Sequence, residues 1–363
     1  MSTSAPTVGI VGLGFGRAHI PAFQANGCHV IALCQRGQAS AKALADRYHV
    51  PGVFGRWEEM LETARPDIVV IATPPHLHHP IALRAFAQGA HVLCEKPLAM
   101  SRVEGEAMAT AAERAGRVAM TGFNWRFAAA MQELHARVGE GVLGRVFHVS
   151  ARWLGARWAK ETEAPTWRMD RAQAGHGSMG DMGVHLVDLV RWHFGEFVRV
   201  AARTGVAYPQ RSAPGVSRPA DTEDHCTLIG ELESGAAVTL TTSRVARGMN
   251  EHALEAFGSG GGLGYRFLRE GDRWWEGELR ATASGDALKP VTPRTAADRS
   301  AGEGDQMEVI GKATIAPLVA RLLEAVRTGA PASPSFRDGA RAQAVLDAAL
   351  EATARRAWVE VPG

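Results

Sequence analysis

The chain has 363 residues, enough for two domains that each bury a core. Its 40 Lys and Arg residues almost balance its 38 Asp and Glu residues, for a net charge of +2, and this balance argues against a nucleic-acid partner. No apolar stretch approaches the roughly 20 residues of a membrane span, no basic leader opens the chain, and the four cysteines lack metal or redox spacing. We therefore expect a cytoplasmic protein with free thiols and no membrane partner.

A glycine-rich turn follows the first apolar run, at residues 7–11, and precedes a helical pattern. Gly12 permits a tight turn there, and Gly14 lets the backbone approach a pyrophosphate group. The spacing is GxGxG and not GxGxxG, because the next glycine is Gly16. The pattern predicts a dinucleotide-binding site, and the residues expected near the cofactor phosphates are Gly12, Gly14, Phe15 and Gly16.

The second predicted strand, residues 29–34, ends at Gln35 and Arg36. In NAD-binding sites an acidic residue about 20 positions beyond the glycines usually holds the ribose 2′-hydroxyl. No acidic residue stands at this strand end, whereas Arg36 offers a cation that suits a 2′-phosphate. We expect Gln35 and Arg36 to contact the cofactor, with NADP favoured and NAD possible. The alternative is that Arg36 is a solvated arginine at a turn.

Predicted helices and apolar strands then alternate, with a strand at 67–72 followed by Thr73, Pro74 and His78. This alternation predicts a parallel sheet with crossover helices. The cluster of histidines at 76–79 has no acidic or cysteine partner spaced to complete a metal site, so we expect no metal. A loop over the cofactor, with Thr73, Pro74 and His78 contacting it, fits the position better.

The stretch 91–97 reads as a buried strand that ends in Glu95, Lys96 and Pro97. Proline cannot donate to a strand ladder, so Lys96 is expected at the carboxyl end of the strand, the edge that faces the ligand crevice of a parallel sheet. Glu95 and Lys96 are therefore candidates to contact cofactor or substrate. A surface ion pair between them is the alternative.

A helix opened by Ser101 and Glu104 leads to a strand at 118–121 and an aromatic and basic turn at 122–127. The turn leaves the sheet at the same edge as Lys96. Asn124 is therefore a candidate cofactor contact and Arg126 a candidate substrate contact, with packing of an exposed loop as the alternative.

From residue 146 the strands become longer and alternate in polarity, which favours a large, mostly antiparallel sheet. We predict an α/β protein with a Rossmann dinucleotide-binding domain at 1–122. A second α/β domain for substrate binding and oligomerisation is expected at 123–363.

Asp181 and His185 lie four residues apart, so on a helix they share one face, and Asp188 falls near it. The structural alternative is an Asp181 that stabilises the start of the helix and a His185 packed on the sheet. The stretch from Trp153 to Arg168 precedes this helix, and within it we expect Trp167 and Arg168 to contact substrate.

Six motifs of the chain, in this order, resemble those of the Gfo/Idh/MocA family. They are the glycine turn, Ala72-Thr-Pro-Pro with His78, Glu95-Lys96-Pro97, Gly122-Phe-Asn-Trp-Arg-Phe, Asp181-Met-Gly-Val-His185 and Ser335-Phe-Arg-Asp-Gly. That family includes glucose-fructose oxidoreductase and inositol dehydrogenase. The resemblance implies reversible NAD(P)-linked oxidation of a hydroxyl on a sugar, cyclitol or related polyol, by homodimers or homotetramers. It also implies that Lys96, Asp181 and His185 are the catalytic group.

The expected chemistry agrees, because a hydride leaves a carbinol carbon only as the hydroxyl proton leaves too. His185, with an unperturbed pKa of about 6.5, suits the base, and Lys96, with one near 10.4, suits the cation that stabilises the alkoxide. Asp181 would orient them or share the proton path. Two alternatives remain: a dinucleotide-binding sensor without catalysis, and a relative that uses NAD transiently in glycoside cleavage.

Overall fold

The structure is a computed structural model, and it describes residues 5–268, 276–283, 287–294 and 305–363. Its contacts divide the chain into two compact units, each formed by two separate segments. The first unit contains Met1–Phe127 and Asp298–Ala340, and the second contains Ala128–Ala297 and Arg341–Gly363.

The first unit is built on a six-stranded parallel sheet with the strand order β3-β2-β1-β4-β5-β6. This is the doubly wound order of a Rossmann fold, and it confirms the predicted architecture. The strands are β1 (Thr7–Val11), β2 (His29–Cys34), β3 (Gly52–Phe54), β4 (Ile68–Ile71), β5 (His91–Cys94) and β6 (Ala119–Thr121).

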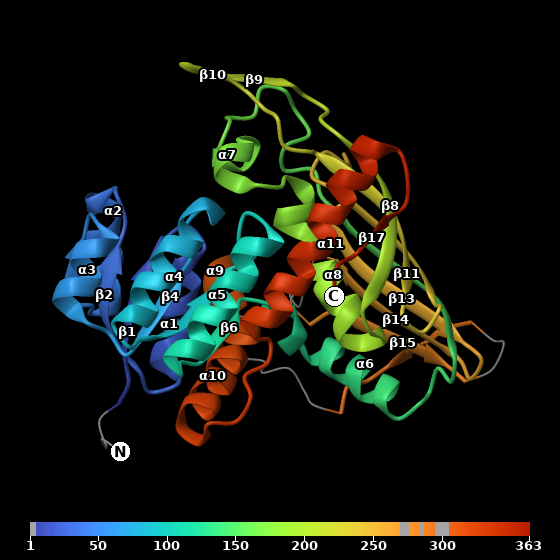
Figure 1. Cartoon of the computed structure of the whole chain (residues 1–363), viewed down its shortest axis with the longest axis horizontal. Helices are drawn as coiled ribbons and strands as arrows, with labels where there is room; N and C mark the ends of the chain where they lie inside the picture. The colour runs from blue at the N-terminus through green and yellow to red at the C-terminus, as the bar shows by residue number, and fades with distance from the viewer. Residues whose placement is uncertain (1–4, 269–275, 284–286, 295–304) are drawn as a thin grey trace. The chain divides into compact units, whose positions relative to one another are not determined.

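Helices connect these strands, and β4 is buried along its whole length, as a central strand of a parallel sheet should be (Figure 1). Ser101 caps the helix that follows β5, because its side chain accepts from the Glu104 amide, and Gly116 ends that helix in the left-handed conformation. The connecting helices are α1 (His19–Ala25), α2 (Gln38–Tyr48), α3 (Trp57–Ala64), α4 (His78–Ala87) and α5 (Arg102–Ala115), with 3₁₀ turns at Gly16–Ala18, Pro75–Leu77 and Asn124–Phe127.

The described residues from 305 to 340 return to the first unit, whereas the sequence-based division placed them in the second. The returning elements are α9 (Gln306–Ile310), a π-helical turn at Gly311–Ile315, and α10 (Ala316–Thr328). Gly311 packs so closely on the 3₁₀ turn before α1 that a Cβ there would lie 2.5 Å from the Ala18 carbonyl oxygen, and Asn26 donates to the Ala316 carbonyl. An amphipathic helix does not reveal in its own sequence which core it covers, so this return had no local signal.

The second unit is built on a nine-stranded sheet with the order β16-β15-β14-β13-β7-β12-β11-β8-β17. Its pairings are antiparallel except for the parallel pair β7 and β12, as predicted for a mostly antiparallel sheet. The strands are β7 (Val146–Leu154), β8 (Phe197–Gly205), β11 (His225–Leu232), β12 (Ala237–Ser243), β13 (Glu251–Gly258), β14 (Gly262–Leu268), β15 (Glu278–Thr282), β16 (Lys289–Val291) and β17 (Val359–Glu360), and a separate hairpin joins β9 (Gln210–Ala213) to β10 (Val216–Pro219).

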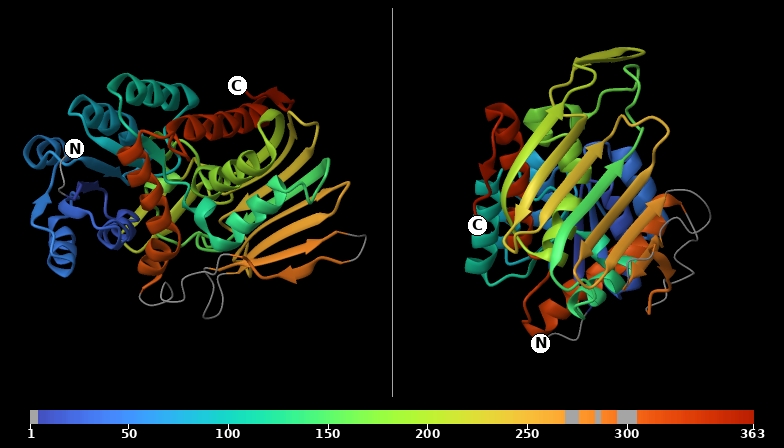
Figure 2. Two further views of the ribbon diagram at one scale, coloured as in Figure 1. Left: turned by 90° about the horizontal axis from the view of Figure 1, so that it is seen from below. Right: turned by 90° about the vertical axis from the view of Figure 1, so that its right-hand side faces the viewer.

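One face of this large sheet carries helices and the other, turned toward the viewer in the right-hand view of Figure 2, carries none among the described residues. The alternating burial of β11 and β12 records this one-sided covering. The helices of the unit are α6 (Ala129–Gly139), α7 (Arg171–Ala174) and α8 (Val184–Phe194), with a 3₁₀ turn at Trp167–Met169, and α11 (Phe336–Arg355) contributes its residues from Arg341 onward.

The segment that carries Asp181 and His185 is helical, but it is not one regular α-helix. Asp181 lies in a π-helical turn at Met179–Gly183, and His185 lies in the first turn of α8. Gly183 packs against β12, where a Cβ would lie 3.2 Å from Thr242 Cγ2. Such π-turns occur often at functional sites, and sequence periodicity does not distinguish them from α-helix. None of the helices in the described ranges is both long and apolar enough to cross a membrane.

Candidate active site

In the first unit, the crevice for a ligand is expected where the strand order reverses, between β1 and β4. The glycine turn stands there. Gly12 has a φ of +89°, and a Cβ on it would lie 2.5 Å from the Ala72 carbonyl oxygen, so only glycine fits. The turn is tied to its neighbours because the Gly12 amide donates to the Cys34 carbonyl (2.9 Å) and the Ala72 amide donates to the Val11 carbonyl (2.8 Å).

The other two glycines of the turn have different surroundings. A Cβ on the exposed Gly14 would meet nothing within 4 Å, so the backbone is open to an approaching group. Gly16 is buried, and a Cβ there would lie 3.1 Å from the Ala72 Cβ. Gly16 thus provides the close packing of helix on strand that the third glycine of GxGxxG usually provides, which explains how the shortened spacing works. Phe15, between them, is half-buried, and its ring lies edge-on to His19 at 6.1 Å.

Gln35 and Arg36 follow the end of β2, as expected. The Gln35 side chain donates to Ser40 Oγ (2.7 Å), and Ser40 Oγ donates to the Gly37 carbonyl (2.9 Å). This small network orders the turn into α2. Arg36 is exposed, and its guanidinium forms no ion pair with another described residue.

The loop after β4 is held in place by hydrogen bonds of the His78 ring. One ring nitrogen of His78 lies 2.9 Å from the Thr73 carbonyl oxygen and the other lies 3.0 Å from the Pro97 carbonyl oxygen. Burial lowers the pKa of His78, although both carbonyls oppose that shift. Thr73 Oγ1 is buried and has no hydrogen-bond partner within the described part of the chain, so this hydroxyl beside the crevice is available to a ligand. Pro74 leads directly into the 3₁₀ turn that begins at Pro75.

Glu95 is buried at the end of β5, and its partner is a residue that the sequence did not single out. The Glu95 carboxylate lies 2.8 Å from His19 Nε2, and both side chains are almost fully buried. A Cβ on Gly122 would lie 2.9 Å from Glu95 Oε1, so the first residue of the turn after β6 must be this small. Lys96 follows Glu95 at the carboxyl edge of the sheet and is half-buried. Glu95 Oε2 also accepts from the Lys96 amide (3.4 Å), so Glu95 helps to hold the turn that carries Lys96, and its direct contact with a ligand stays a prediction.

Asn124 and Arg126 are both buried, and both have partners within the first unit. The Asn124 amide donates to Thr314 Oγ1 (2.7 Å). The Arg126 guanidinium donates to Ser333 Oγ and to Asp338 Oδ1, each at 3.2 Å. These bonds tie the returning segment to the end of β6, so direct contacts of Asn124 and Arg126 with a ligand stay predictions.

In the second unit, Asp181 forms an ion pair with Arg168. Arg168 Nε donates to Asp181 Oδ1 at 3.2 Å, and the two side chains are 30% and 24% exposed. The Arg168 guanidinium lies over the Trp167 ring at 4.3 Å. Spacing alone could not predict this pairing, because the two residues are 13 positions apart in an irregular segment.

His185 is buried at 3% exposure in the first turn of α8. Its ring lies 5.6 Å from that of Trp153 on β7, and Trp153 is stacked on His252 of β13 at 4.6 Å and 9°. The rings of the sheet therefore limit the orientations open to the His185 imidazole. Asp188, one turn further on, is also buried.

The described residues contain no group of three or more His, Cys, Asp or Glu side chains that could hold a metal ion.

Sequence reasoning missed His19 and also Glu223, Asp224 and Arg244, which are all buried. The sequence signal that could have identified Glu223 and Asp224 is their position as two adjacent acidic residues directly before the alternating strand β11, but such a pair more commonly marks a turn.

Comparison with known proteins gives two matches to one family. A model described as the oxidoreductase family with an NAD-binding Rossmann fold matches residues 7–123, and a model described as the GFO/IDH/MocA C-terminal domain matches residues 131–264. Together the two matches cover well over half of the chain.

Individual relatives of the chain are also oxidoreductases. Levoglucosan dehydrogenase of Pseudarthrobacter phenanthrenivorans is 28% identical over 98% of each chain. D-xylose 1-dehydrogenase (NADP(+)) 2 of Haloferax volcanii is 34% identical over 54% of this chain and 59% of its own. A solved structure of levoglucosan dehydrogenase in complex with NADH and L-sorbose superposes with a TM-score of 0.86, 27% identity and coverage of 99% of this chain and 100% of that one.

The Rossmann unit with its glycine turn, the second unit with its large open sheet, and the two family matches in the same order lead to one conclusion: the chain belongs to the GFO/IDH/MocA family of oxidoreductases.

Proposed function

We propose that the protein is an NAD(P)-dependent dehydrogenase that transfers a hydride between the nicotinamide cofactor and a hydroxyl-bearing carbon of a sugar, cyclitol or related polyol. The observation that carries the proposal is the glycine turn at the β1/β4 switch point, where Gly12 permits close approach and Gly14 faces open space. The similarity over nearly the full length to levoglucosan dehydrogenase, solved with NADH and a sugar, supports the substrate class.

The residues around that turn fit a dinucleotide. The open backbone at Gly14 suits a pyrophosphate, and the Thr73 hydroxyl, which has no hydrogen-bond partner among the described residues, suits a polar group of the cofactor. When bound, the nicotinamide supplies the hydride acceptor. Gly12, Gly14, Phe15, Gly16, Thr73 and Pro74 would hold the cofactor directly, while His78 and Glu95 would act by fixing the loops that contact it.

We assign proton transfer to His185 and charge stabilisation to Lys96. A neutral His185 takes the hydroxyl proton, and the Lys96 ammonium stabilises the alkoxide that forms as the proton leaves. Asp181, paired with Arg168, orients the hydroxyl or shares the proton path. The motifs of the family and the chemistry support this assignment, and the buried, ring-bounded position of His185 suits a base whose orientation matters.

For the cofactor we propose a preference for NADP over NAD. The exposed Arg36 and the absence of a carboxylate at Gln35 support it, and the Haloferax relative is named for NADP. The levoglucosan dehydrogenase complex holds NADH, so both cofactors occur among the relatives.

For the substrate we propose contacts with the Trp167–Arg168 pair. The guanidinium stacked on the indole offers donors beside an apolar ring, which suits the hydroxyls and the C–H face of a sugar. Arg126 is the weaker candidate, because Ser333 and Asp338 already engage its guanidinium.

We also propose a homodimer or homotetramer that associates through the helix-free face of the nine-stranded sheet, in the cytoplasm. Ile229 on that sheet is 49% exposed, which supports an interface there. The four buried free cysteines support a reducing compartment. Light scattering on the purified protein tests the assembly, because a monomer at micromolar concentration would contradict it.

The test of the function is a screen with NADP⁺ and NAD⁺ against levoglucosan, D-glucose, D-xylose and myo-inositol, followed by absorbance of reduced cofactor. Accumulation of reduced cofactor with at least one polyol supports the proposal. Conversion of a glycoside without net reduced cofactor would indicate transient use of NAD instead. Tight binding of NADPH with no turnover of any polyol or its keto form would indicate a sensor.

A further inference from the structure

The Arg168–Asp181 pair is supported from behind by three consecutive residues that have no part in the proposed chemistry. We propose that Thr222, Glu223 and Asp224, called here the 222–224 clamp, position this pair for catalysis. The inference rests on the proposed function, because Asp181 and Arg168 are assigned there. The clamp residues are positioning residues, since they act through the backbone of the two segments that carry the pair.

Glu223 holds the segment that carries Asp181. Its side chain is 2% exposed, and its Oε1 accepts from the Gly177 amide (2.6 Å) and the Met179 amide (3.1 Å). Its backbone carbonyl accepts from the Ser178 amide (2.8 Å). The Asp181 amide in turn donates to the Gly177 carbonyl (2.9 Å), so the start of the helical segment is fixed to Glu223 just before Asp181.

The approach of the two segments is as close as a backbone allows. A Cβ on Gly177 would lie 2.0 Å from the Glu223 carbonyl oxygen, a distance that no side chain tolerates. Glycine at 177 is therefore required by this contact. The sequence Gly175-His-Gly177 before the helix, which has no obvious role in chemistry, is explained in part by the clamp.

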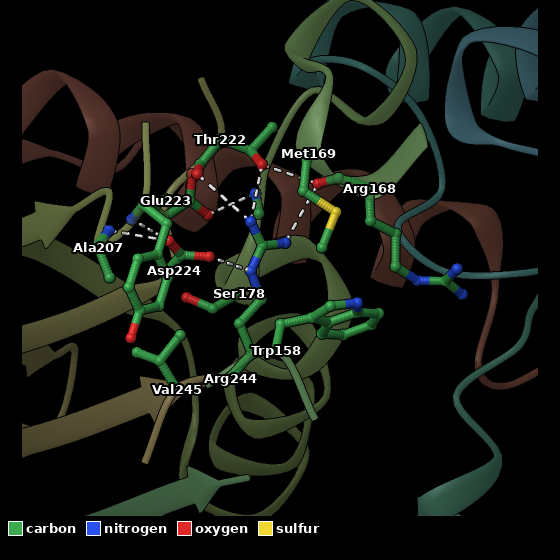
Figure 3. A network of polar contacts seen from close by, with 12 residues as sticks. Trp158, Arg168, Met169, Ser178, Ala207, Thr222, Glu223, Asp224, Arg244 and Val245 are labelled. Atoms are coloured by element: carbon green, nitrogen blue, oxygen red, sulfur yellow. Dashed lines mark hydrogen bonds and ion pairs between the residues drawn. The ribbon is translucent and has the colours of Figure 1, made fainter. Parts of the chain in front are cut away.

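Thr222 and Asp224 hold the segment that carries Arg168. The Thr222 hydroxyl donates to the Arg168 carbonyl (2.7 Å), and so does Arg244 Nη1 (3.1 Å). Arg244 is in turn fixed by Asp224, whose Oδ1 accepts from Arg244 Nε (2.7 Å) and from Arg211 Nη2 (2.9 Å). Figure 3 shows the carbonyl end of Arg168 drawn into this network while its guanidinium points away from it.

The burial of these groups indicates that they fix geometry more than they add stability. Asp224, Arg211 and Arg244 are at most 1% exposed, and buried ionic networks of this kind are weak evidence for stability but can specify geometry. The Arg168–Asp181 pair is by contrast partly exposed, and a partly exposed pair does not hold its own geometry strongly. A single chain segment that fixes both backbones supplies the geometry that the pair alone lacks.

The test compares Thr222→Val, which removes the hydroxyl and keeps the shape, with Thr222→Ser, which keeps the hydroxyl. Both should fold, because the Arg168 carbonyl still accepts from Arg244 Nη1 in either variant. Arg244 Nη2 donates to the Thr222 hydroxyl (3.0 Å) in the unmodified protein, and in Thr222→Val it keeps the Thr222 carbonyl as an acceptor (3.4 Å). The matched control is Thr353→Val in the same unit, where the lost hydroxyl donates to the Ala202 carbonyl (3.1 Å) far along the chain from the pair.

The first readout is hydrogen exchange and needs no substrate. Peptides covering residues 166–183 should exchange faster in Thr222→Val than in the unmodified protein, should be restored in Thr222→Ser, and should be unaffected in Thr353→Val. Unchanged exchange in Thr222→Val would refute the clamp whatever the protein catalyses.

The second readout is turnover with the best polyol of the screen. Thr222→Val should lower kcat roughly tenfold, below the 10²-fold expected for a full 1 Å displacement, with NADPH binding unchanged. In an Arg168→Met background Thr222→Val should add no further loss, because it acts through Arg168. Faster exchange with unaltered kcat, or full additivity with Arg168→Met, would overturn the positioning role. If the unmodified protein turns over no polyol, the proposed function fails while the exchange experiment still decides the clamp.

Discussion

Replacing Arg36 with alanine should remove most of the preference for NADP while leaving NAD binding almost unchanged. Arg36 lies directly after β2, it is exposed, and the neighbouring Gln35 amide is turned toward Ser40, so the guanidinium is the cation best placed for a 2′-phosphate. No carboxylate at this strand end competes for it.

The magnitude follows from that exposure. A hydrogen bond to a charged group contributes about 1.5–3 kcal/mol when sheltered, and solvent screening reduces it for an exposed side chain. We expect Arg36→Ala to weaken NADPH binding by about 1–2 kcal/mol, or roughly 5- to 30-fold in Kd. Because the interaction is electrostatic and exposed, the difference between NADPH and NADH should also shrink as ionic strength rises from about 0.05 to 0.5 M.

Titration of NADPH and NADH by quenching of tryptophan fluorescence measures both constants. Arg114→Ala is the control, because it removes another exposed cation from the last turn of α5, away from the carboxyl edge of the sheet. The reasoning is refuted if the unmodified protein binds NADH as tightly as NADPH, or if Arg36→Ala weakens both to the same extent.

Five further substitutions test three other parts of the molecule. His185→Ala should lower turnover by about 10²–10⁴-fold and leave NADPH binding intact. Lys96→Ala should lower turnover by a comparable factor, and near-normal kinetics in both variants would contradict the catalytic assignment. Gly12→Ala should destabilise the protein by about 1–3 kcal/mol, because the φ of Gly12 is +89° and an added Cβ would lie 2.5 Å from a carbonyl oxygen. Gly14→Ala should instead weaken NADPH binding without lowering the Tm. Melting curves in which Gly14→Ala lowers the Tm and Gly12→Ala does not would contradict this account of the turn. Burial by itself would raise the pKa of Asp224, but Arg244, the Ala207 amide and Arg211 outweigh it and hold that pKa below its ordinary value. The stabilisation of the folded state by the charged Asp224 is therefore present above the unfolded pKa of about 3.9 and is lost as the pH falls through the folded pKa. Asp224→Asn should lower the free energy of unfolding by about 3–5 kcal/mol at pH 7, and the difference from the unmodified protein should narrow below about pH 4. Thermal melting of both proteins at several pH values measures this difference.

Much of the first unit could be predicted because its signals are local. The alternation of apolar strands with helices, the turn at Gly12, and the proline after Lys96 each report on a few neighbouring residues, and the structure has these elements within one or two residues of the expected bounds. The spacing of Asp181 and His185 likewise identified one helical segment, although the π-helical turn that contains Asp181 left no trace in the periodicity.

What the sequence by itself determined, then, is most strands and helices of the first unit and the parallel and antiparallel character of the two sheets. The residues assigned to hydride chemistry stay predictions. The tertiary structure alone decided the partners of the charged groups: His19 for Glu95, Thr314 for Asn124, Asp338 for Arg126, and the 222–224 clamp for the Arg168–Asp181 pair. The physical reason is that a buried polar side chain must be satisfied by whatever group the fold brings to it. These partners lie from 46 to 212 positions away along the chain, where no local pattern can indicate them.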